Sequence, residues 1–387
     1  MSKERPINGE ITANYTRPDI VFTHKDIATI DRGGLCVLFK SLASGLASQG
    51  FRVHVLTTQE LVIDNISVHR LPAVDDALSY SKYVSEAISD IGPLIAESST
   101  WRFELLEYSR LVNKGSKVVV RADPSASTLF DNATNLDQGE GELCRNADLI
   151  LAVSGFAKRD IQKKYHIPDG KIRVVYNGVQ QLHEMNFGSR ITSGEILTPS
   201  TNESNPIISL PISDIINPDK INVLWIGKPT KMKGFDMLEA IVANAPDELN
   251  FIINMGYSIQ EVKWADQNYR KCTFIRGLTK SDQQLLFHNS DALLSTSTVE
   301  GFGIVVAEAL EMGIPTILNI NCEVFREFLG INGIKLVDVM DVNVVYDAFK
   351  NIKPQKSPNS LLPYHLTQQE MVRQSLEHYR RMLDIKA

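Results

Sequence analysis

Cysteine is scarce and scattered in this sequence. The four cysteines, Cys36, Cys144, Cys272 and Cys322, are spread over 387 residues, and no two of them form a CxxC pair. Disulfide scaffolds and structural zinc sites need closely spaced cysteines, so we expect neither. Free thiols are typical of a reducing compartment, and we therefore expect a cytoplasmic protein.

Long apolar runs are also lacking. No uninterrupted apolar stretch reaches the ~18 residues that a membrane-spanning helix needs. The opening residues, MSKERPINGEITANYTRPD, contain no apolar segment of the kind found in a signal peptide. We therefore expect no integral membrane segment.

An excess of positive charge is missing as well. The chain has 40 Lys and Arg against 46 Asp and Glu, which gives a formal net charge of −6. This balance argues against a nucleic-acid or anionic-membrane partner bound through overall charge. A hydrophobic content of 43% and a charged content of 22% are those of a globular protein. With 387 residues the chain exceeds one ordinary core, which indicates two domains.

Short strand-like runs alternate with amphipathic stretches along most of the chain, and this order predicts an α/β fold with parallel sheets. In the first half, strands are expected at 20–22, 52–58, 67–71, 94–96, 117–121 and 149–153, and helices at 35–50 and 101–112. In the second half, strands are expected at 221–227, 251–256, 271–277, 292–297 and from 316, and helices at 235–245, 281–291, 304–312 and 366–385.

Composition divides the chain into four segments. We place a first domain at 1–179 and a second at 221–365. Between them, 180–220 is rich in Ser, Asn, Pro and Thr and is read as a polar linker or insertion. Residues 366–387 are expected to form a C-terminal helix that packs back on the first domain.

The stretch STSTVEGFGIVVAEALEMGIPTILN, at 295–319, contains a candidate anion site. Glycines on both sides of Phe302 let the backbone approach a ligand closely, and the helix that follows offers free N–H groups at its start. Glu300 precedes this turn, and Glu308 stands about 7 Å along the helix axis. Two carboxylates around an anion seat suit a nucleotide sugar, although a plain turn with two surface glutamates explains the pattern as well.

Two further loops are candidate ligand contacts. Lys228, Lys231 and Lys233 lie between two glycines where a strand ends, and ligands of open parallel sheets bind at such ends. Lysines there would neutralise a leaving diphosphate, although Lys231 is more simply a surface residue. The pair Gly33-Gly34 is a weaker candidate, because it lacks a GxGxxG pattern and a Walker lysine and fits a tight turn.

Together these segments resemble the retaining glycosyltransferases of family 4, which have the GT-B fold of two Rossmann-like domains with parallel sheets facing across a cleft. The resemblance covers nearly the whole chain. EGFGIVVAE, at 300–308, is similar to the E-x7-E motif of that family, and VVYNGV, at 174–179, to its interdomain crossing. WIGKPTKMKGFDML resembles the phosphate-binding loop, and RGGLCVLFKSLASGLASQGFRVHVLT the N-terminal glycine loop and helix.

The resemblance implies a role for each matching residue. The first domain would hold the acceptor and the second the donor nucleotide sugar. The implied catalytic residues are Glu300, which holds the hydroxyls of the transferred sugar, and Lys233 and Lys228, which hold the diphosphate. Family members usually have arginine at the position of Lys228, and lysine keeps the charge but not the planar fork. The implied donor-binding residues are Gly33 and Gly34 in the first domain, Leu278 at the base, Gly301 and Phe302, Gly303 and Ile304 with their amides at the phosphates, and Glu308 at the ribose diol.

The acceptor side departs from the family pattern. Many members have a histidine where this chain reads VVVRADPSAS, and Glu97, Arg121 and Asp123 follow first-domain strands there. An acidic pocket favours a cationic acceptor, unless these acids cap helices or pair with arginines. The segments ESSTWRFELLEYSR and VVVRADPSASTLF also resemble enzymes that glycosylate 2-deoxystreptamine in aminoglycoside antibiotic assembly, including N-acetylglucosaminyltransferases.

We therefore expect transfer of a hexosyl unit, N-acetylglucosamine from its UDP donor, with retention of the anomeric configuration. The expected acceptor is a small cationic aminocyclitol such as 2-deoxystreptamine, in aminoglycoside antibiotic biosynthesis. The nucleotide sugar is a co-substrate, and no cofactor is expected. No metal is expected either, because the sequence has no DxD motif at a strand end. Three alternatives remain: a family 4 enzyme of capsule, O-antigen or glycolipid synthesis, a sugar-nucleotide epimerase of the related fold, and a non-catalytic nucleotide-sugar sensor.

Overall fold

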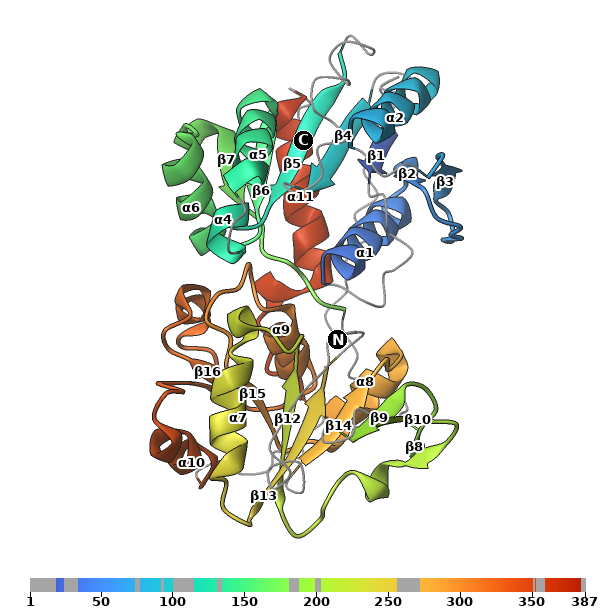
Figure 1. The fold of residues 1–387 in the computed structure, drawn as a ribbon. Helices are drawn as coiled ribbons and strands as arrows, with labels where there is room; N and C mark the ends of the chain where they lie inside the picture. The colour runs from blue at the N-terminus through green and yellow to red at the C-terminus, as the bar shows by residue number, and fades with distance from the viewer. Residues whose placement is uncertain are drawn as a thin grey trace, which may run out of the picture.

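The chain folds into two α/β domains, one above the other in Figure 1. The computed structural model describes residues 19–23, 34–73, 77–91, 94–99, 115–130, 134–180, 188–198, 203–255, 272–350, 352 and 359–383. Gly33 and the helix expected at 101–112 lie outside these residues. Among the helices that are described, none is long and apolar enough to cross a membrane.

The N-terminal domain is built on a seven-stranded parallel sheet in the order β3-β2-β1-β4-β5-β6-β7. Its strands are β1 (Asp19–Thr23), β2 (Val53–Thr57), β3 (Ser67–Arg70), β4 (Leu94–Ser99), β5 (Lys117–Ala122), β6 (Leu149–Ala152) and β7 (Ile172–Val174). Its helices are α1 (Gly34–Ser48), α2 (Ala77–Ile91), α4 (Ala126–Leu129), α5 (Thr134–Asn146) and α6 (Gly155–Tyr165). Parallel strands joined by helices need both faces of the sheet covered, and the two faces carry separate apolar clusters.

The C-terminal domain has an eight-stranded sheet in the order β10-β9-β14-β13-β12-β15-β16-β17. The strands from β12 onward are parallel to one another. They are β12 (Ile221–Ile226), β13 (Leu249–Asn254), β14 (Cys272–Arg276), β15 (Ala292–Ser295), β16 (Thr316–Asn319) and β17 (Ile334–Val337). The helices are α7 (Phe235–Ala243), α8 (Lys280–Asn289), α9 (Ile304–Glu311) and α10 (Val342–Lys350). This architecture agrees with the fold class expected from the sequence.

The polar segment between the domains is folded into the second domain where it is described. It forms β8 (Arg190–Ile191), β9 (Glu195–Thr198), β10 (Glu203–Pro206) and β11 (Leu210–Pro211). Strand β9 pairs antiparallel with β14, and the Arg276 guanidinium contacts the Glu195 carboxylate at 2.7 Å beside that pairing. The segment is therefore an insertion that extends the sheet, because it covers the edge that β14 would otherwise leave open.

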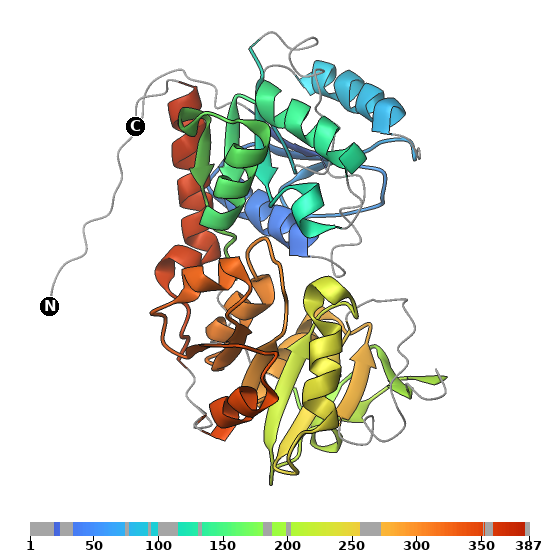
Figure 2. The same cartoon turned by 60° about the vertical axis from the view of Figure 1, so that its left-hand side comes forward.

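The last helix, α11 (Gln368–Met382), lies against the N-terminal domain in both ribbon views (Figures 1 and 2). Its Met371, Val372 and Leu376 are buried in the apolar cluster that includes α1. The chain reaches it through a second crossing, where Val179 pairs with Thr367. A Cβ at Gly178 would lie 2.3 Å from the Thr367 carbonyl oxygen, so this crossing requires glycine.

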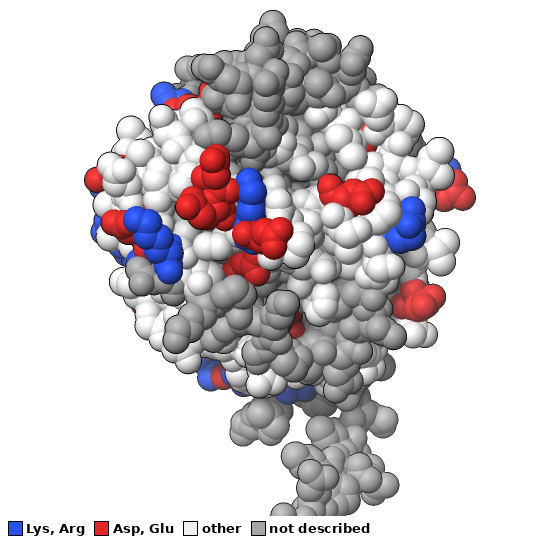
Figure 3. Space-filling view, turned by 90° about the horizontal axis from the view of Figure 1, so that it is seen from below, with Lys and Arg blue, Asp and Glu red and all other residues white. Residues whose placement is uncertain are grey.

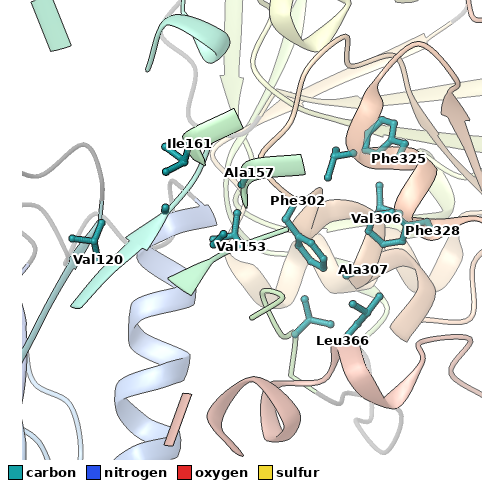
Figure 4. Close-up of a cluster of buried hydrophobic side chains, with 14 of the residues drawn as sticks. Val120, Val153, Ala157, Ile161, Phe302, Val306, Ala307, Phe325, Phe328 and Leu366 are labelled. Carbon is teal, nitrogen blue, oxygen red and sulfur yellow. The ribbon is translucent and has the colours of Figure 1, made fainter. Parts of the chain in front are cut away.

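One apolar cluster continues from the first domain into the second (Figure 4). Phe302 and Phe328 of the second domain lie in the same buried cluster as Val153 and Ala157 of the first. Tyr176, on the interdomain crossing, contacts the Phe302 ring with centroids 6.0 Å apart. The two domains are thus joined by packed side chains as well as by two chain crossings.

Charge is dispersed on the face of the second domain drawn in Figure 3. Acidic and basic side chains lie beside one another at several places there, and no continuous basic area is visible on this face.

Candidate functional site

Two loops at the carboxyl ends of neighbouring strands are held together at the centre of the second domain. The loop after β12 carries Lys233, and the loop after β15 carries Glu300. The Thr298 N–H donates to the Met232 carbonyl at 2.9 Å, and the Thr296 hydroxyl donates to the Lys233 carbonyl at 2.8 Å. These bonds fix the two loops as one unit.

Glycine is required where these loops touch. Gly234 has φ of +62° and follows the lysines. A Cβ at this position would lie only 2.1 Å from the Thr296 carbonyl oxygen. The left-handed backbone and the close approach both exclude a side chain, so Gly234 sets the distance between the lysine loop and the glutamate loop.

Lys233 and Glu300 form an ion pair within this unit. The Lys233 Nζ lies 2.5 Å from the Glu300 Oε1, and the Ser297 hydroxyl donates to the same oxygen at 2.8 Å. Asn319 donates to the Ser297 carbonyl at 3.1 Å. Both charged side chains remain partly exposed, at 22% and 16%. A cation and a carboxylate are thus presented together, each with its orientation fixed.

The helix α9 begins beside this pair. Its N-cap is Gly303, with φ of +98°, and no side chain caps the first turn. The N–H groups at the start of a helix lack intrahelical partners and carry its positive dipole end. The turn from Gly301 to Ile304 therefore has the features of the predicted anion seat.

Phe302 is an exception within that turn. Its side chain is only 3% exposed and lies in the interdomain apolar cluster (Figure 4). The donor contact implied for Phe302 stays a prediction, and it would involve the backbone of this residue because the side chain is buried. The ring fills the space between the domains, because burial of a phenyl group is more favourable than its exposure to water.

Glu308 is buried in α9 and already has two partners. Its carboxylate accepts a hydrogen bond from the Lys280 Nζ at Oε1 and another from the Gln283 Nε2 at Oε2, the latter at 3.2 Å. Both partners belong to the first turn of α8, which follows the buried Leu278. Sequence reasoning missed Lys280 and Gln283, because their distance from Glu308 depends on how α8 and α9 pack.

Lys228 stands apart from this arrangement. Its side chain is exposed at the end of β12, and within the described part of the chain it has no ion pair or side-chain hydrogen bond. Lys231 is exposed in the same way. In the N-terminal domain, Gly34 begins α1.

Glu97 and Arg121 are not at the surface of the cleft. Both side chains are fully buried, with the Arg121 Nε 2.7 Å from the Glu97 Oε1. Arg121 also donates to the Ser375 hydroxyl at 3.1 Å, and the Tyr379 hydroxyl donates to Glu97. The expectation that these two residues line an acceptor pocket is wrong. Side chains alternate along a strand, and at these two positions they point under α11 and anchor it.

Asp123 is the predicted acceptor residue that does face the second domain. A Cβ at Gly301 would lie 2.4 Å from the Asp123 Oδ1, so the carboxylate presses against the turn that precedes α9. Burial raises the pKa of Asp123 to about 7, and the nearby Glu140 and Glu300 carboxylates act in the same direction. Asp123 is therefore a weakly acidic group next to the Lys233 and Glu300 pair.

A second contact between the domains was not predicted. The Glu327 carboxylate accepts hydrogen bonds from the N–H groups of Gly155 at 2.9 Å and Phe156 at 2.6 Å. It thus caps α6 of the other domain, where a negative charge is favourable. Arg159 and Glu323 form an exposed ion pair beside it at 2.9 Å. We call Glu327 and the start of α6 the interdomain latch.

Two segments of the chain match models of glycosyltransferase families. Residues 213–337 match the family model described as glycosyl transferases group 1, and residues 133–181 match the model described as glycosyltransferase family 4. An uncharacterised 41.2 kDa protein in the cps region of Klebsiella pneumoniae is 28% identical over 215 residues, 53% of this chain. The match covers 54% of that protein, so the chain spans about half the length of this relative.

A second relative extends over more of the chain. An uncharacterised glycosyltransferase of Methanocaldococcus jannaschii is 20% identical over 323 residues, which are 74% of this chain and 76% of that protein.

Solved structures show the same arrangement of domains. Sucrose-phosphate synthase from Thermosynechococcus elongatus has a TM-score of 0.74 at 14% identity, over 96% of this chain and 100% of that one. Anabaena HepE in complex with UDP and glucose has a TM-score of 0.70 at 15% identity, over 94% and 100%. Likeness at such identities concerns the fold alone. The chain therefore has a GT-B fold that carries glycosyltransferase group 1 and family 4-like segments.

Proposed function

We propose that this protein is a retaining hexosyltransferase that moves a hexosyl unit from a nucleoside diphosphate sugar to a hydroxyl group of a small polar acceptor. The observation that carries the proposal is the Lys233 and Glu300 ion pair beside the open N-terminus of α9. The group 1 match extends over this whole region.

The donor is proposed to bind along the carboxyl ends of β12 and β15. The amides at the start of α9 and the Lys233 ammonium would hold the diphosphate, and Glu308 would accept hydrogen bonds from the ribose diol. Negative charge grows on the diphosphate as the glycosidic bond breaks, so fixed donors aimed at it lower the barrier. UDP-N-acetylglucosamine is the donor that we propose, and the complex of the HepE neighbour with UDP is consistent with this class.

In the proposed reaction the acceptor oxygen attacks the anomeric carbon from the face that the diphosphate leaves. The bond from the anomeric carbon to the phosphate oxygen breaks, and the departing phosphate oxygen takes the proton of the acceptor hydroxyl. No protein nucleophile takes part, and Glu300 orients the transferred sugar. Contact between the domains would exclude water from the reacting atoms.

The acceptor is proposed to bind next to Asp123. The burial of Glu97 and Arg121 leaves Asp123 as the predicted acceptor residue in the cleft. The Glu140 and Glu300 carboxylates both act to raise the pKa of Asp123. A cation would relieve their mutual repulsion, which supports a cationic aminocyclitol such as 2-deoxystreptamine as the acceptor. The cytoplasmic location proposed for this reaction agrees with the free thiols of Cys144, Cys272 and Cys322.

A second candidate function is synthesis of a cell-surface polysaccharide. The Klebsiella relative in the cps region favours it. Such an enzyme would use the same donor site and differ in the acceptor alone.

An acceptor screen separates these candidates. Purified protein is supplied with UDP-N-acetylglucosamine, and UDP release is followed with 2-deoxystreptamine, with a neutral cyclitol of similar size, or with no acceptor. Release that depends on 2-deoxystreptamine supports the aminocyclitol proposal, and release with the neutral cyclitol alone contradicts it. Tight UDP binding without release by any acceptor, cell-surface saccharides included, would instead indicate a non-catalytic sensor.

A further inference from the structure

The first turn of α8 lies between two sets of contacts that come from different parts of the chain. On one side Lys280 and Gln283 hold the Glu308 carboxylate. On the other side Thr279 and Asp282 are bound by the inserted segment 188–198. Because this turn is fixed on both sides, the position of the insertion affects where Lys280 and Gln283 hold the Glu308 carboxylate.

The insertion side of this turn is a compact hydrogen-bond cluster. The buried Asp282 accepts from the Thr192 N–H at 3.1 Å and from the Ser193 hydroxyl. The Ser193 oxygen in turn accepts from the Thr279 N–H at 2.7 Å. Thr279 is the N-cap of α8 and also donates to Asp282 at 2.9 Å. Ser193 therefore replaces water at the start of the helix.

Close backbone packing joins the same segment to the residues expected at the base. A Cβ at Gly194, which has φ of +91°, would lie 2.5 Å from the Arg276 carbonyl oxygen and 2.9 Å from the Leu278 side chain. The insertion is thus in direct contact with the end of β14, where Leu278 is expected to meet the donor base.

The burial and the hydrogen bonds of Glu308 show what the first turn of α8 does for its carboxylate. Glu308 is only 6% exposed, and both of its oxygens are engaged by α8. A carboxylate oxygen has lone pairs for more than one donor, so Glu308 retains capacity for the two hydroxyls of a ribose. The Lys280 charge also compensates a carboxylate that is otherwise costly to bury.

We propose that the inserted segment 188–198 and the first turn of α8 form a support that fixes Glu308 for recognition of the ribose diol, with Lys280 and Ser193 as positioning residues. The inference rests on the proposed function, because it assumes that the donor carries a ribose. It assigns to the insertion a part in selecting ribonucleotide donors.

The test compares two ligands that differ in one hydroxyl group. UDP and 2′-deoxy-UDP are titrated into the wild-type protein and into Lys280→Met, and their dissociation constants are measured by calorimetry. The wild type is expected to prefer UDP by at least about tenfold, the effect of one hydrogen bond to a charged group. Lys280→Met should lose most of this preference and weaken UDP binding more than 2′-deoxy-UDP binding. Lys280→Arg should restore the preference, and Lys335→Met, a change of an exposed lysine on β17, should leave it intact.

The insertion is tested with Ser193→Ala. This variant should show a smaller loss of the same preference, while Ser189→Ala, an exposed serine of the same segment, should not. Thermal unfolding of each variant shows whether it is folded.

Unchanged preference in folded Lys280→Met and Ser193→Ala would overturn the proposal. Tighter UDP binding by Lys280→Met would also overturn it, because Lys280 would then block Glu308. Failure of the wild-type protein to bind UDP or any other nucleoside diphosphate would count against the proposed function itself.

Discussion

The Lys233 Nζ lies 2.5 Å from the Glu300 Oε1, although the two residues belong to loops that follow different strands. Gly234 and the hydrogen bonds of Thr296 and Thr298 hold those loops in register. The fold itself thus holds the pair in place. Organisation of this kind is what electrostatic catalysis requires, because the charges need no rearrangement as the leaving group develops.

Replacement of Glu308 by alanine tests the assignment of the ribose site. Glu308→Ala should weaken UDP binding by about 1–3 kcal/mol, the range for hydrogen bonds to a charged group. Calorimetry gives the affinity directly. Glu248→Ala, a change of an exposed glutamate remote from α9, serves as the control. Equal UDP affinity in Glu308→Ala and the wild type would refute the assigned role.

Asp123 makes acceptor binding depend on pH. The pKa of Asp123 is raised to about 7 by burial and by neighbouring carboxylates, so the group is protonated at pH 6 and ionised at pH 8. A cationic acceptor should therefore bind more tightly at pH 8. Asp123→Asn should remove this pH dependence and leave donor affinity nearly unchanged. A pH profile of the acceptor KM checks the prediction, and a profile that the variant retains would contradict it.

The same raised pKa predicts an effect on stability. An acid whose pKa is higher in the folded state binds its proton more tightly there than in the unfolded chain. Its contribution to stability is therefore complete at low pH and is lost as the pH rises through about 7. Asp123→Asn should raise the thermal midpoint at pH 8 relative to the wild type and should have little effect at pH 4. An equal effect at both values would show that this carboxyl titrates normally.

The buried Arg121 is predicted to matter for stability and not for acceptor affinity. Arg121→Met leaves Glu97 buried without its cation, a change that typically costs about 3–5 kcal/mol. Denaturant unfolding measures this loss. Arg52→Met, which removes an exposed partner of Asp19, should cost no more than about 1 kcal/mol. An Arg121→Met variant with native stability and a raised acceptor KM would contradict this prediction, because Arg121 would then act in acceptor binding and not in stability.

The interdomain latch gives a further prediction. Glu327→Ala removes a carboxylate that caps α6 from the other domain, so it should destabilise the domain interface by about 1–3 kcal/mol. Glu323→Ala removes an exposed ion pair beside it and should cost less than about 1 kcal/mol. Denaturant unfolding compares the two variants, and small-angle scattering reports whether the domains separate. Equal losses of stability in Glu327→Ala and Glu323→Ala would mean that the interdomain latch stabilises the interface no more than the exposed ion pair does.

The sequence predicted the parts of the fold that local pattern controls. The strand at 292–295, the glycine turn and α9 were expected because apolar runs, glycines and helical spacing coincide there. The insertion could not be predicted as strands, because β9 is a strand only through its pairing with β14. Its polar composition carries no local signal of that partner.

The site was predictable only in part for a related reason. Glu300 and Lys233 follow strands in a recognisable order, and they do meet. Glu97 and Arg121 also lie at strand ends, but whether the face on which their side chains point is covered depends on where α11 packs. Lys280 and Glu327 depend in the same way on contacts between distant elements. Such contacts are set by tertiary packing and leave no pattern in one sequence.

The most direct test of the central claim is acceptor-dependent UDP release by the wild type and by Lys233→Ala. The assay uses UDP-N-acetylglucosamine with whichever acceptor supports release, and Lys231→Ala, a change in the same loop, is the matched control. Lys233→Ala is expected to lower kcat by about 10²–10³-fold, the range for loss of one preorganised charge-stabilising group, while the control stays near the wild-type rate. A Lys233→Ala enzyme that releases UDP as fast as the wild type would contradict it.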